Sequence, residues 1–106
     1  MKKYIFVLFA IVLISGYACK KEKKDTTPPV IVLKGAEKVY VNLDSAYVEP
    51  GYTATDDVDG DITDKVVVSG TVDVHTEGTY MLYYDVTDKA GNAAEQKERT
   101  VKVLKF

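Results

Sequence analysis

The sequence of 106 residues contains one cysteine and one histidine. A single cysteine, Cys19, excludes an internal disulfide. The histidine, His75, has no cysteine or second histidine near it, so a zinc site or a nucleophilic triad would lack partners, and we expect it to lie on the surface. The chain also lacks a phosphate-binding glycine loop, and it is too short to build the cleft that a pair of glycosidase carboxylates needs. These absences predict a protein that is not an enzyme.

Positive charge is scarce in the main part of the chain. From residue 30 onward there are 8 basic and 14 acidic residues, which leaves a net charge near −6. No basic stripe is available to neutralise phosphates, so nucleic acid is excluded as a partner.

The longest apolar run, residues 4–14, has 11 residues. A membrane-spanning helix needs roughly 20 apolar residues, so this run is too short to cross a bilayer. It follows Lys2 and Lys3 and is followed by the small residue Ala18. A basic start, a short apolar run and a small residue before the cleavage point predict a secretory signal peptide over residues 1–18.

Cys19 directly follows that segment, and this placement resembles a bacterial lipoprotein signal, in which the new N-terminal cysteine is lipidated after cleavage. The match departs from the usual pattern at Gly16, where leucine is common, and at Tyr17, which is bulky. The resemblance implies lipid attachment at Cys19, the membrane as a partner, and an exported lipoprotein at the outer membrane or cell surface. The alternative is an ordinary signal peptide with a cysteine or free thiol nearby.

Residues 19–29 are predicted to form a disordered tether after the lipidated cysteine. The charge run KKEKKD at 20–25 has no apolar surface to bury and cannot offset the entropy of ordering. Pro28 and Pro29 favour an extended chain that holds the domain away from the membrane. The alternative role of the charge run is a sorting signal for lipoprotein export.

Residues 30–106 have the composition and periodicity of strands. Valine, threonine and tyrosine dominate, and apolar residues alternate with polar ones along 38–43, 80–87 and 100–104. Turn residues divide the segment into strands expected at 30–34, 38–43, 51–55, 65–69, 71–75, 79–87 and 95–104. This pattern predicts an all-β domain, an Ig-like antiparallel β-sandwich of about seven strands, with an open barrel as the alternative.

The segment GTYML at 78–82 has the form of a tyrosine corner. In Ig-like sandwiches the tyrosine of this motif begins a strand, and its hydroxyl caps nearby backbone. We therefore expect a structural role for Tyr80, with ligand binding as the alternative.

A series of segments carries a family resemblance: TPPVI (27–31), EPGYTATD (49–56), DGDIT (59–63), SGTVD (69–73), GTY (78–80), YDVTD (84–88), AGN (90–92) and RTVKV (99–103). In this order and spacing they resemble the bacterial Ig-like domain first described in a pesticidal crystal toxin, a domain of unknown function related to hyalin-repeat-like modules. The resemblance implies a spacer or binding module of secreted and surface proteins, without catalytic residues.

Carboxylates are densest at residues 56–61, the loop between the expected strands 51–55 and 65–69. In an Ig-like sandwich this loop shares one end with the loop at 88–92. Calcium takes six to eight oxygen ligands from such loops, although the spacing is not that of an EF-hand. The candidate calcium ligands are Asp56, Asp57, Asp59, Asp61 and Asp88. The alternative is that they are ordinary turn residues, because aspartate favours such turns. Calcium is the one cofactor that the sequence suggests.

Tyr40 and Tyr83 lie on the strand faces opposite the expected core residues. Exposed aromatic side chains stack on sugars or mark a protein contact, whereas the alternative is that the two tyrosines pair across strands. Together these features predict a lipid-anchored module of the cell envelope that binds a glycan or protein partner through the loop end. The alternative is a structural subunit that docks on a larger envelope complex through a sheet face or edge strand.

Overall fold

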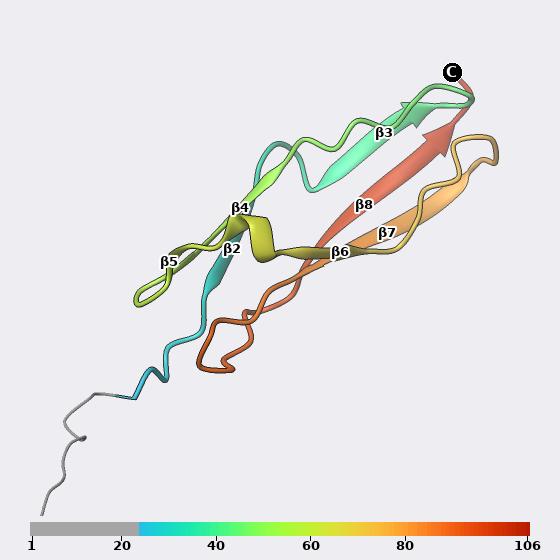
Figure 1. Cartoon of the computed structure of the whole chain (residues 1–106). Coiled ribbons are helices and arrows are strands. Elements are labelled where there is room, and N and C mark those ends of the chain that lie inside the picture. Colours follow the sequence, from blue (N-terminus) through green and yellow to red (C-terminus); the bar gives the residue numbers. More distant parts are fainter. Residues whose placement is uncertain (1–23) are drawn as a thin grey trace, which may run out of the picture.

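A computed structural model describes residues 24–106, which form two β-sheets packed face to face (Figure 1). One sheet has the strand order β2-β4-β5, and the other has the order β3-β8-β7-β6. The strands are β2 (Val30–Leu33), β3 (Lys38–Asn42), β4 (Tyr52–Asp56), β5 (Gly60–Asp61), β6 (Val67–Ser69), β7 (Gly78–Asp85) and β8 (Lys97–Leu104). The expected all-β sandwich of about seven strands is confirmed. The described part of the chain also contains a 3₁₀ turn, η3 (Thr63–Lys65).

One strand pair departs from the antiparallel prediction, because β3 runs parallel to β8, with Tyr40 opposite Lys102. The four-residue link between β2 and β3, residues 34–37, crosses to the other sheet instead of closing a hairpin. Gly35 turns this link with a φ of 75°, in the left-handed region that favours glycine. The crossing places β3 at the edge of the second sheet, in the same direction as β8.

The strand expected at 71–75 was wrong, because this segment is a loop and turn. Asp73 organises the turn: its Oδ1 accepts a hydrogen bond from the backbone N–H of His75 at 3.0 Å, and its carbonyl accepts one from Thr76 at 3.3 Å. Aspartate in this position competes with strand pairing. Val72 and Val74 are still half-buried and pack against the core.

The core consists of side chains that alternate along the strands and point between the sheets. Its buried apolar members are Ile31, Val41, Ala54, Ile62, Leu82, Tyr84, Val86, Val101 and Val103. The members in β3, β7 and β8 are those that period-2 alternation assigns to the inner face, so the predicted faces of these strands are confirmed.

The core also contains a fully buried arginine, Arg99, in β8. Its guanidinium carbon lies 5.5 Å from the centroid of the Tyr84 ring. The side chain donates hydrogen bonds to the Tyr84 hydroxyl, a Glu49 carboxylate oxygen and the backbone carbonyls of Lys34, Ala36 and Gly51. Arg99 therefore joins β8 to the crossing link and to the loop before β4.

Glu49 is the negative partner of Arg99, at 3.1 Å. It also accepts hydrogen bonds from the hydroxyls of Tyr47 at 3.0 Å and Tyr84 at 2.7 Å, and from the N–H of Gly51 at 2.9 Å. Loss of hydration would raise the pKa of Glu49, but these hydrogen bonds and the charge of Arg99 outweigh it and lower the pKa. The ion pair is therefore fully hydrogen-bonded, as a buried pair must be to avoid a large desolvation cost.

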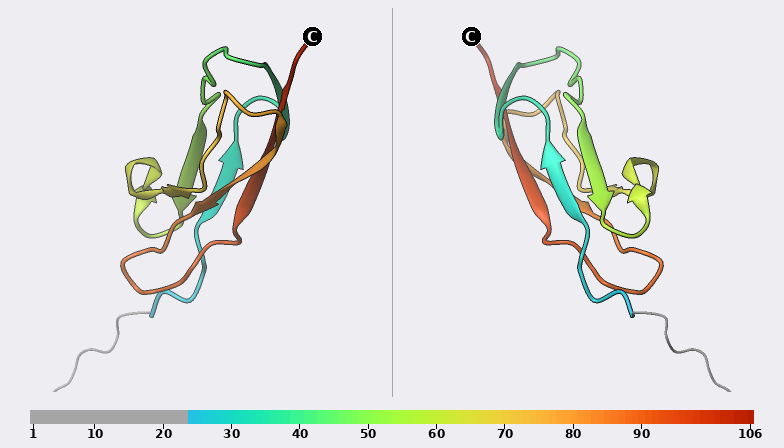
Figure 2. Two further views of the ribbon diagram at one scale, coloured as in Figure 1. Left: turned by 90° about the vertical axis from the view of Figure 1, so that its right-hand side faces the viewer. Right: turned by 90° about the vertical axis from the view of Figure 1, so that its left-hand side faces the viewer.

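The two ends of the sandwich differ in what they carry. The chain enters at the end that holds the loop after β4 and the loop between β7 and β8, and its C-terminus lies at the opposite end (Figure 2). Within residues 24–106 no helix has the length and apolar character needed to cross a membrane.

Candidate functional site

The loop after β4 is organised by Asp56, the last residue of that strand. Asp56 occupies an inward position two residues after the buried Ala54, and only 8% of it is exposed. Its Oδ2 accepts hydrogen bonds from the N–H groups of Val58 at 3.0 Å and Asp59 at 2.9 Å. Aspartate is suited to this position because its short side chain closes a turn on its own backbone.

The loop between β7 and β8 is closed in a similar way by Asp88, which is 6% exposed. Asn92 donates its backbone N–H to Oδ1 of Asp88 at 2.8 Å and its side-chain amide to Oδ2 at 3.1 Å. The N–H of Lys89 reaches across to Oδ2 of Asp59 at 2.8 Å. The two loops are therefore joined by hydrogen bonds, and their carboxylates face a common region.

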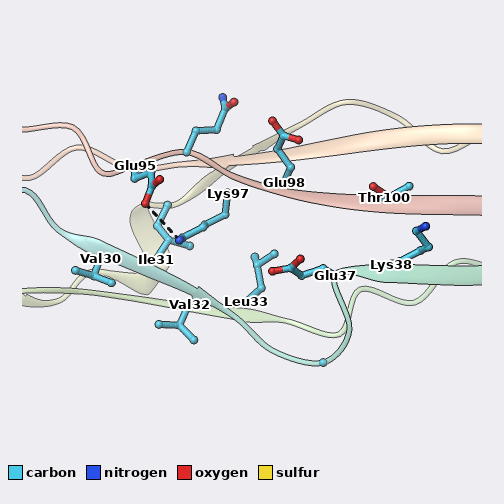
Figure 3. A pocket seen from close by; sticks show the side chains of 12 residues that line it. Val30, Ile31, Val32, Leu33, Glu37, Lys38, Glu95, Lys97, Glu98 and Thr100 are labelled. Carbon is cyan, nitrogen blue, oxygen red and sulfur yellow. Dashed lines mark ion pairs between the residues drawn. The ribbon is translucent and has the colours of Figure 1, made fainter.

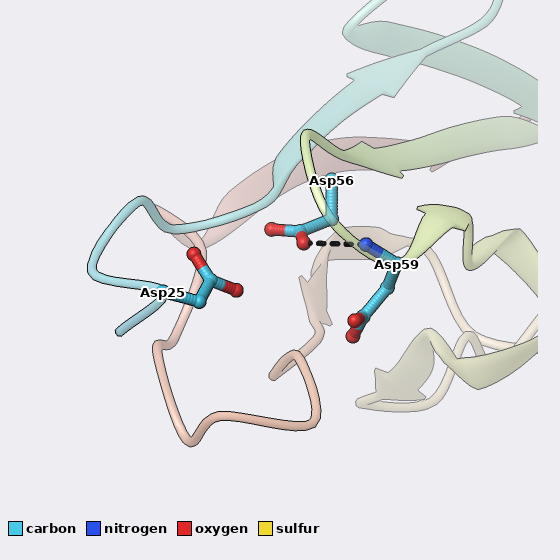
Figure 4. A group of neighbouring side chains, drawn as sticks. All are labelled: Asp25, Asp56 and Asp59. Atoms are coloured by element: carbon cyan, nitrogen blue, oxygen red, sulfur yellow. Dashed lines mark hydrogen bonds between the residues drawn. The ribbon is translucent and has the colours of Figure 1, made fainter. Parts of the chain in front are cut away.

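Asp25 completes this region from the segment before β2. Its carbonyl accepts a hydrogen bond from the side-chain amide of Asn92 at 2.9 Å, and its Oδ1 accepts one from the N–H of Thr27 at 3.1 Å. Oxygens of Asp25, Asp56 and Asp59 all lie within 4.8 Å of one another (Figure 4). Asp88 is joined to them through Asn92, which donates to both of its carboxylate oxygens and to the Asp25 carbonyl, and the four residues are called the acidic cluster.

Loss of hydration and the closely spaced carboxylates of the acidic cluster shift the pKa values of Asp25 and Asp88. Loss of hydration, and after it the carboxylates of Asp88 and Asp56, raise the pKa of Asp25 above its ordinary value. Loss of hydration also acts to raise the pKa of Asp88, but the hydrogen bonds from Asn92 outweigh it and lower this pKa. The surroundings therefore oppose ionisation of Asp25 and favour ionisation of Asp88.

The structure brings together three of the five candidate calcium ligands, Asp56, Asp59 and Asp88. Asp57 is exposed and has no part in the acidic cluster. Asp61 instead accepts hydrogen bonds from the hydroxyl and N–H of Thr63, at 2.6 and 3.0 Å, which lower its pKa.

Sequence reasoning missed Asp25, because it closes a run of charged residues typical of a solvated spacer. Cys19, the predicted site of lipid attachment, lies outside the described residues.

The tyrosines of β3 and β7 occupy distinct positions. The hydroxyl of Tyr80 donates a hydrogen bond to the carbonyl of Thr76 at 2.7 Å, which is the contact expected of a tyrosine corner. Tyr40, 56% exposed, and the half-buried Tyr83 share the outer face of the β3-β8-β7-β6 sheet. From the register they are separated by about 14 Å along the strands and about 10 Å across them. They therefore do not form one stacked pair.

A groove of about 700 Å³ runs between β2 and the first half of β8 (Figure 3). Charged side chains from β8 and from the residues just before it line one wall, including the ion pair of Lys97 with Glu95 at 3.5 Å. Val30 and Val32 project from the other side of β2, and each is more than half exposed. This side of the sandwich combines an open strand edge with exposed apolar residues.

His75 is exposed, as expected, and lies in the loop before β7. Its Nδ1 is 2.8 Å from a carboxylate oxygen of Asp44, in the loop after β3. The hydrogen bond and charge of Asp44 raise the pKa of His75. The pair joins the loop after β3 to the loop before β7.

Comparison with known proteins gives consistent matches. The family model described as "Bacterial surface protein, Ig-like domain" matches residues 31–103. An outer cell wall protein of Brevibacillus brevis is 37% identical over 87 residues, which cover 67% of this chain and 9% of that protein. The chain therefore spans about one tenth of the length of this relative.

Two solved structures share both fold and sequence with the chain. The lipoprotein BT2262 from Bacteroides thetaiotaomicron has a TM-score of 0.64 and 37% identity, covering 71% of this chain and 37% of that one. A structure of Clostridium perfringens ZmpB, comprising CBM51-2 in complex with GlcNAc and INT domains, has a TM-score of 0.59 and 31% identity. It covers 74% of this chain and 17% of that one.

Proposed function

Because the chain belongs to the family of bacterial surface Ig-like domains, we propose that it is a lipid-anchored module of the cell envelope that binds a glycan. In this proposal residues 1–18 are removed as a signal peptide and Cys19 carries the lipid. The likeness to a Bacteroides lipoprotein supports the anchor. The pattern of a short apolar run ending at a small residue before Cys19 supports the cleavage.

The position of Asp25 supports an arrangement in which the loop end of the domain faces the membrane. Five residues lie between Cys19 and Asp25, and a fully extended chain from one to the other spans at most about 22 Å. Asp25 lies against the loop end, so a lipid on Cys19 would hold this end near the membrane surface. We expected the partner surface at the loop end. With that end near the membrane, we place the partner surface on the outer face of the β3-β8-β7-β6 sheet instead.

Tyr40 is the observation that carries the glycan proposal. It is an aromatic side chain 56% exposed in the middle of an edge strand, with Lys102 opposite it on β8. A flat sheet face with an exposed ring and flanking polar groups offers apolar stacking and hydrogen bonding together, which is what a sugar ring needs. The GlcNAc in the Clostridium structure makes this sugar the first ligand to test.

The test of glycan binding uses the full chain in detergent and immobilised GlcNAc-containing oligosaccharides. We expect the unchanged chain to bind and Tyr40→Ala to weaken binding at least about tenfold, because the stacking surface is removed. Val48→Ala is the matched control, since Val48 is an exposed apolar residue outside this sheet face. Equal binding of the Tyr40→Ala and unchanged chains would contradict the proposed surface.

The anchor is tested separately by Cys19→Ser in a bacterial host that processes lipoproteins. We expect the unchanged chain in the membrane fraction, labelled by radioactive fatty acid, and the variant without label and released from that fraction. A single acyl group binds membranes only weakly, so the multiply acylated cysteine is needed for retention. Retention of an unlabelled Cys19→Ser chain in the membrane fraction would argue for an anchor other than this lipid.

A second candidate function, assembly on a larger envelope complex, is favoured by the open edge of β2. Within the described residues β2 pairs with β4 alone, and Val30 and Val32 are exposed beside that edge. An extended segment of a partner protein adds readily to such an edge through backbone hydrogen bonds. Binding of glycans that depends on Tyr40 would favour the first candidate over this one.

A further inference from the structure

The acidic cluster has no positive partner among the residues that the structure describes. The three ion pairs found there join His75 to Asp44, Lys97 to Glu95 and Arg99 to Glu49. Carboxylate oxygens of Asp25, Asp56 and Asp59 thus lie close together, with Asp88 joined through Asn92, and none of the four takes part in these ion pairs. Like charges at this separation repel strongly where water is partly excluded.

Two oxygens in the acidic cluster also lack any hydrogen-bond donor. They are Oδ1 of Asp56 and Oδ2 of Asp25, and within residues 24–106 they are the two buried side-chain oxygens without a partner. Asp56 is more than nine-tenths buried, and its carboxylate points toward Asp25 (Figure 4). A buried carboxylate oxygen without a donor costs free energy unless a cation or hydrogen bond compensates it.

The chemistry of the donors selects the class of cation. The cluster offers carboxylate oxygens and no histidine or cysteine, a set that suits hard cations rather than zinc or copper. The ligands come from loops and from the segment before β2, so their geometry is not held to a strict octahedron. Calcium accepts such irregular oxygen sets, whereas magnesium demands near-octahedral geometry and gives up its waters reluctantly.

We propose that the acidic cluster binds a calcium ion, which fixes Asp25 to the loop end of the sandwich. The ion takes the unpartnered oxygens of Asp25 and Asp56 as ligands and is completed by Asp59 and Asp88. Since Asp25 precedes the first strand, the ion joins the segment leading to the domain with the two loops.

The first test uses the full chain in detergent. Calcium is titrated into it with calorimetric detection, and thermal melting is then compared in millimolar CaCl2, in MgCl2 and in chelator. We expect a calcium-binding heat signal and a Tm in calcium higher than in chelator, on the order of 10 °C at a hundredfold excess over the dissociation constant. Magnesium is expected to produce a smaller shift. Identical melting in calcium and chelator would overturn the proposal.

Single substitutions then distinguish a specific calcium site from non-specific attraction of calcium by the negative charge of the loops. Asp25→Asn is expected to weaken calcium binding at least about tenfold, because it removes one charged ligand without touching the sandwich. Asp57→Asn is the matched control, since Asp57 is exposed beside the cluster, and it should keep unchanged affinity. Equal losses in Asp25→Asn and Asp57→Asn would show diffuse attraction instead of a site. Asp56→Asn extends the test to the buried ligand.

Trypsin cleavage after Lys24 reports the position of the segment itself. Calcium is expected to slow this cleavage in the unchanged chain and in Asp57→Asn, and to have no effect in Asp25→Asn. Binding of calcium with unchanged cleavage after Lys24 would contradict the role of Asp25. None of these measurements depends on Tyr40 or on a glycan, so the cation site and the proposed function stand or fall separately.

Discussion

Arg99→Met is expected to destabilise the domain by about 3–5 kcal/mol, because it removes the fully buried member of a hydrogen-bonded ion pair whose other member, Glu49, is half-buried. The substitution removes the hydrogen bonds that Arg99 donates to a Glu49 oxygen, three backbone carbonyls and the Tyr84 hydroxyl. The Glu49 oxygen keeps the N–H of Gly51, and the Gly51 carbonyl keeps the N–H of Lys34, so the carbonyls of Lys34 and Ala36 lose most. A domain of this size has a total stability of about 4–12 kcal/mol, so a substantial unfolded fraction is expected. Urea unfolding followed by circular dichroism measures the change.

The control is Lys102→Met, on the outer face of the same strand, which should change stability by about 0.5 kcal/mol or less. Arg99→Met combined with Glu49→Gln should cost less than the sum of the two single changes, because the glutamine no longer leaves a charge without its partner. A strictly additive double variant, or an Arg99→Met chain as stable as the control, would show that the pair does not act as a unit.

Gly70→Ala is expected to be the second large loss, about 2–4 kcal/mol, for two independent reasons. Gly70 has a φ of 99°, in the left-handed region that a residue with a Cβ adopts at a cost. A Cβ at this position would also lie 2.3 Å from the carbonyl oxygen of Met81, which belongs to β7. The overlap forces the end of β6 away from β7 and weakens the edge of the sheet.

Gly91→Ala separates the two reasons. Gly91 has nearly the same φ, 97°, but no heavy atom lies within 4 Å of a Cβ built there. Thermal unfolding should therefore show a Tm loss for Gly70→Ala clearly larger than that for Gly91→Ala. Equal losses would mean that backbone conformation alone accounts for the effect and that the contact with Met81 relaxes freely.

The inner faces of β3, β7 and β8 were predictable because their apolar residues alternate with period 2 over most of each strand. Arg99 breaks this rule, since it occupies an inward position next to Val101 although arginine is typical of surfaces. Its partner Glu49 lies 50 residues away, and no local pattern connects the two. Such a buried pair becomes visible only when the fold brings its members together.

The sequence predicted that the two acidic loops lie at one end of the sandwich, but it did not predict that Asp25 packs there too. Two loops at one end of a sandwich bring Asp56, Asp59 and Asp88 together by topology alone, and topology followed from the strand pattern. Asp25 lies outside the strands, so periodicity gave no information about where it would pack. The parallel pairing of β3 was also missed, because a four-residue link leaves hairpin and crossover equally open until the sheets are assembled.

The place of β8 within its sheet has a consequence for the order in which the domain can fold. β8 is the last of the seven strands found in residues 24–106, yet it lies between β3 and β7 and joins them. Until residues 97–104 have left the ribosome, these two strands lack their shared neighbour and the interior lacks Arg99. Contacts between such distant parts of a chain form late. The nascent chain therefore remains without its larger sheet until synthesis of the domain is almost complete.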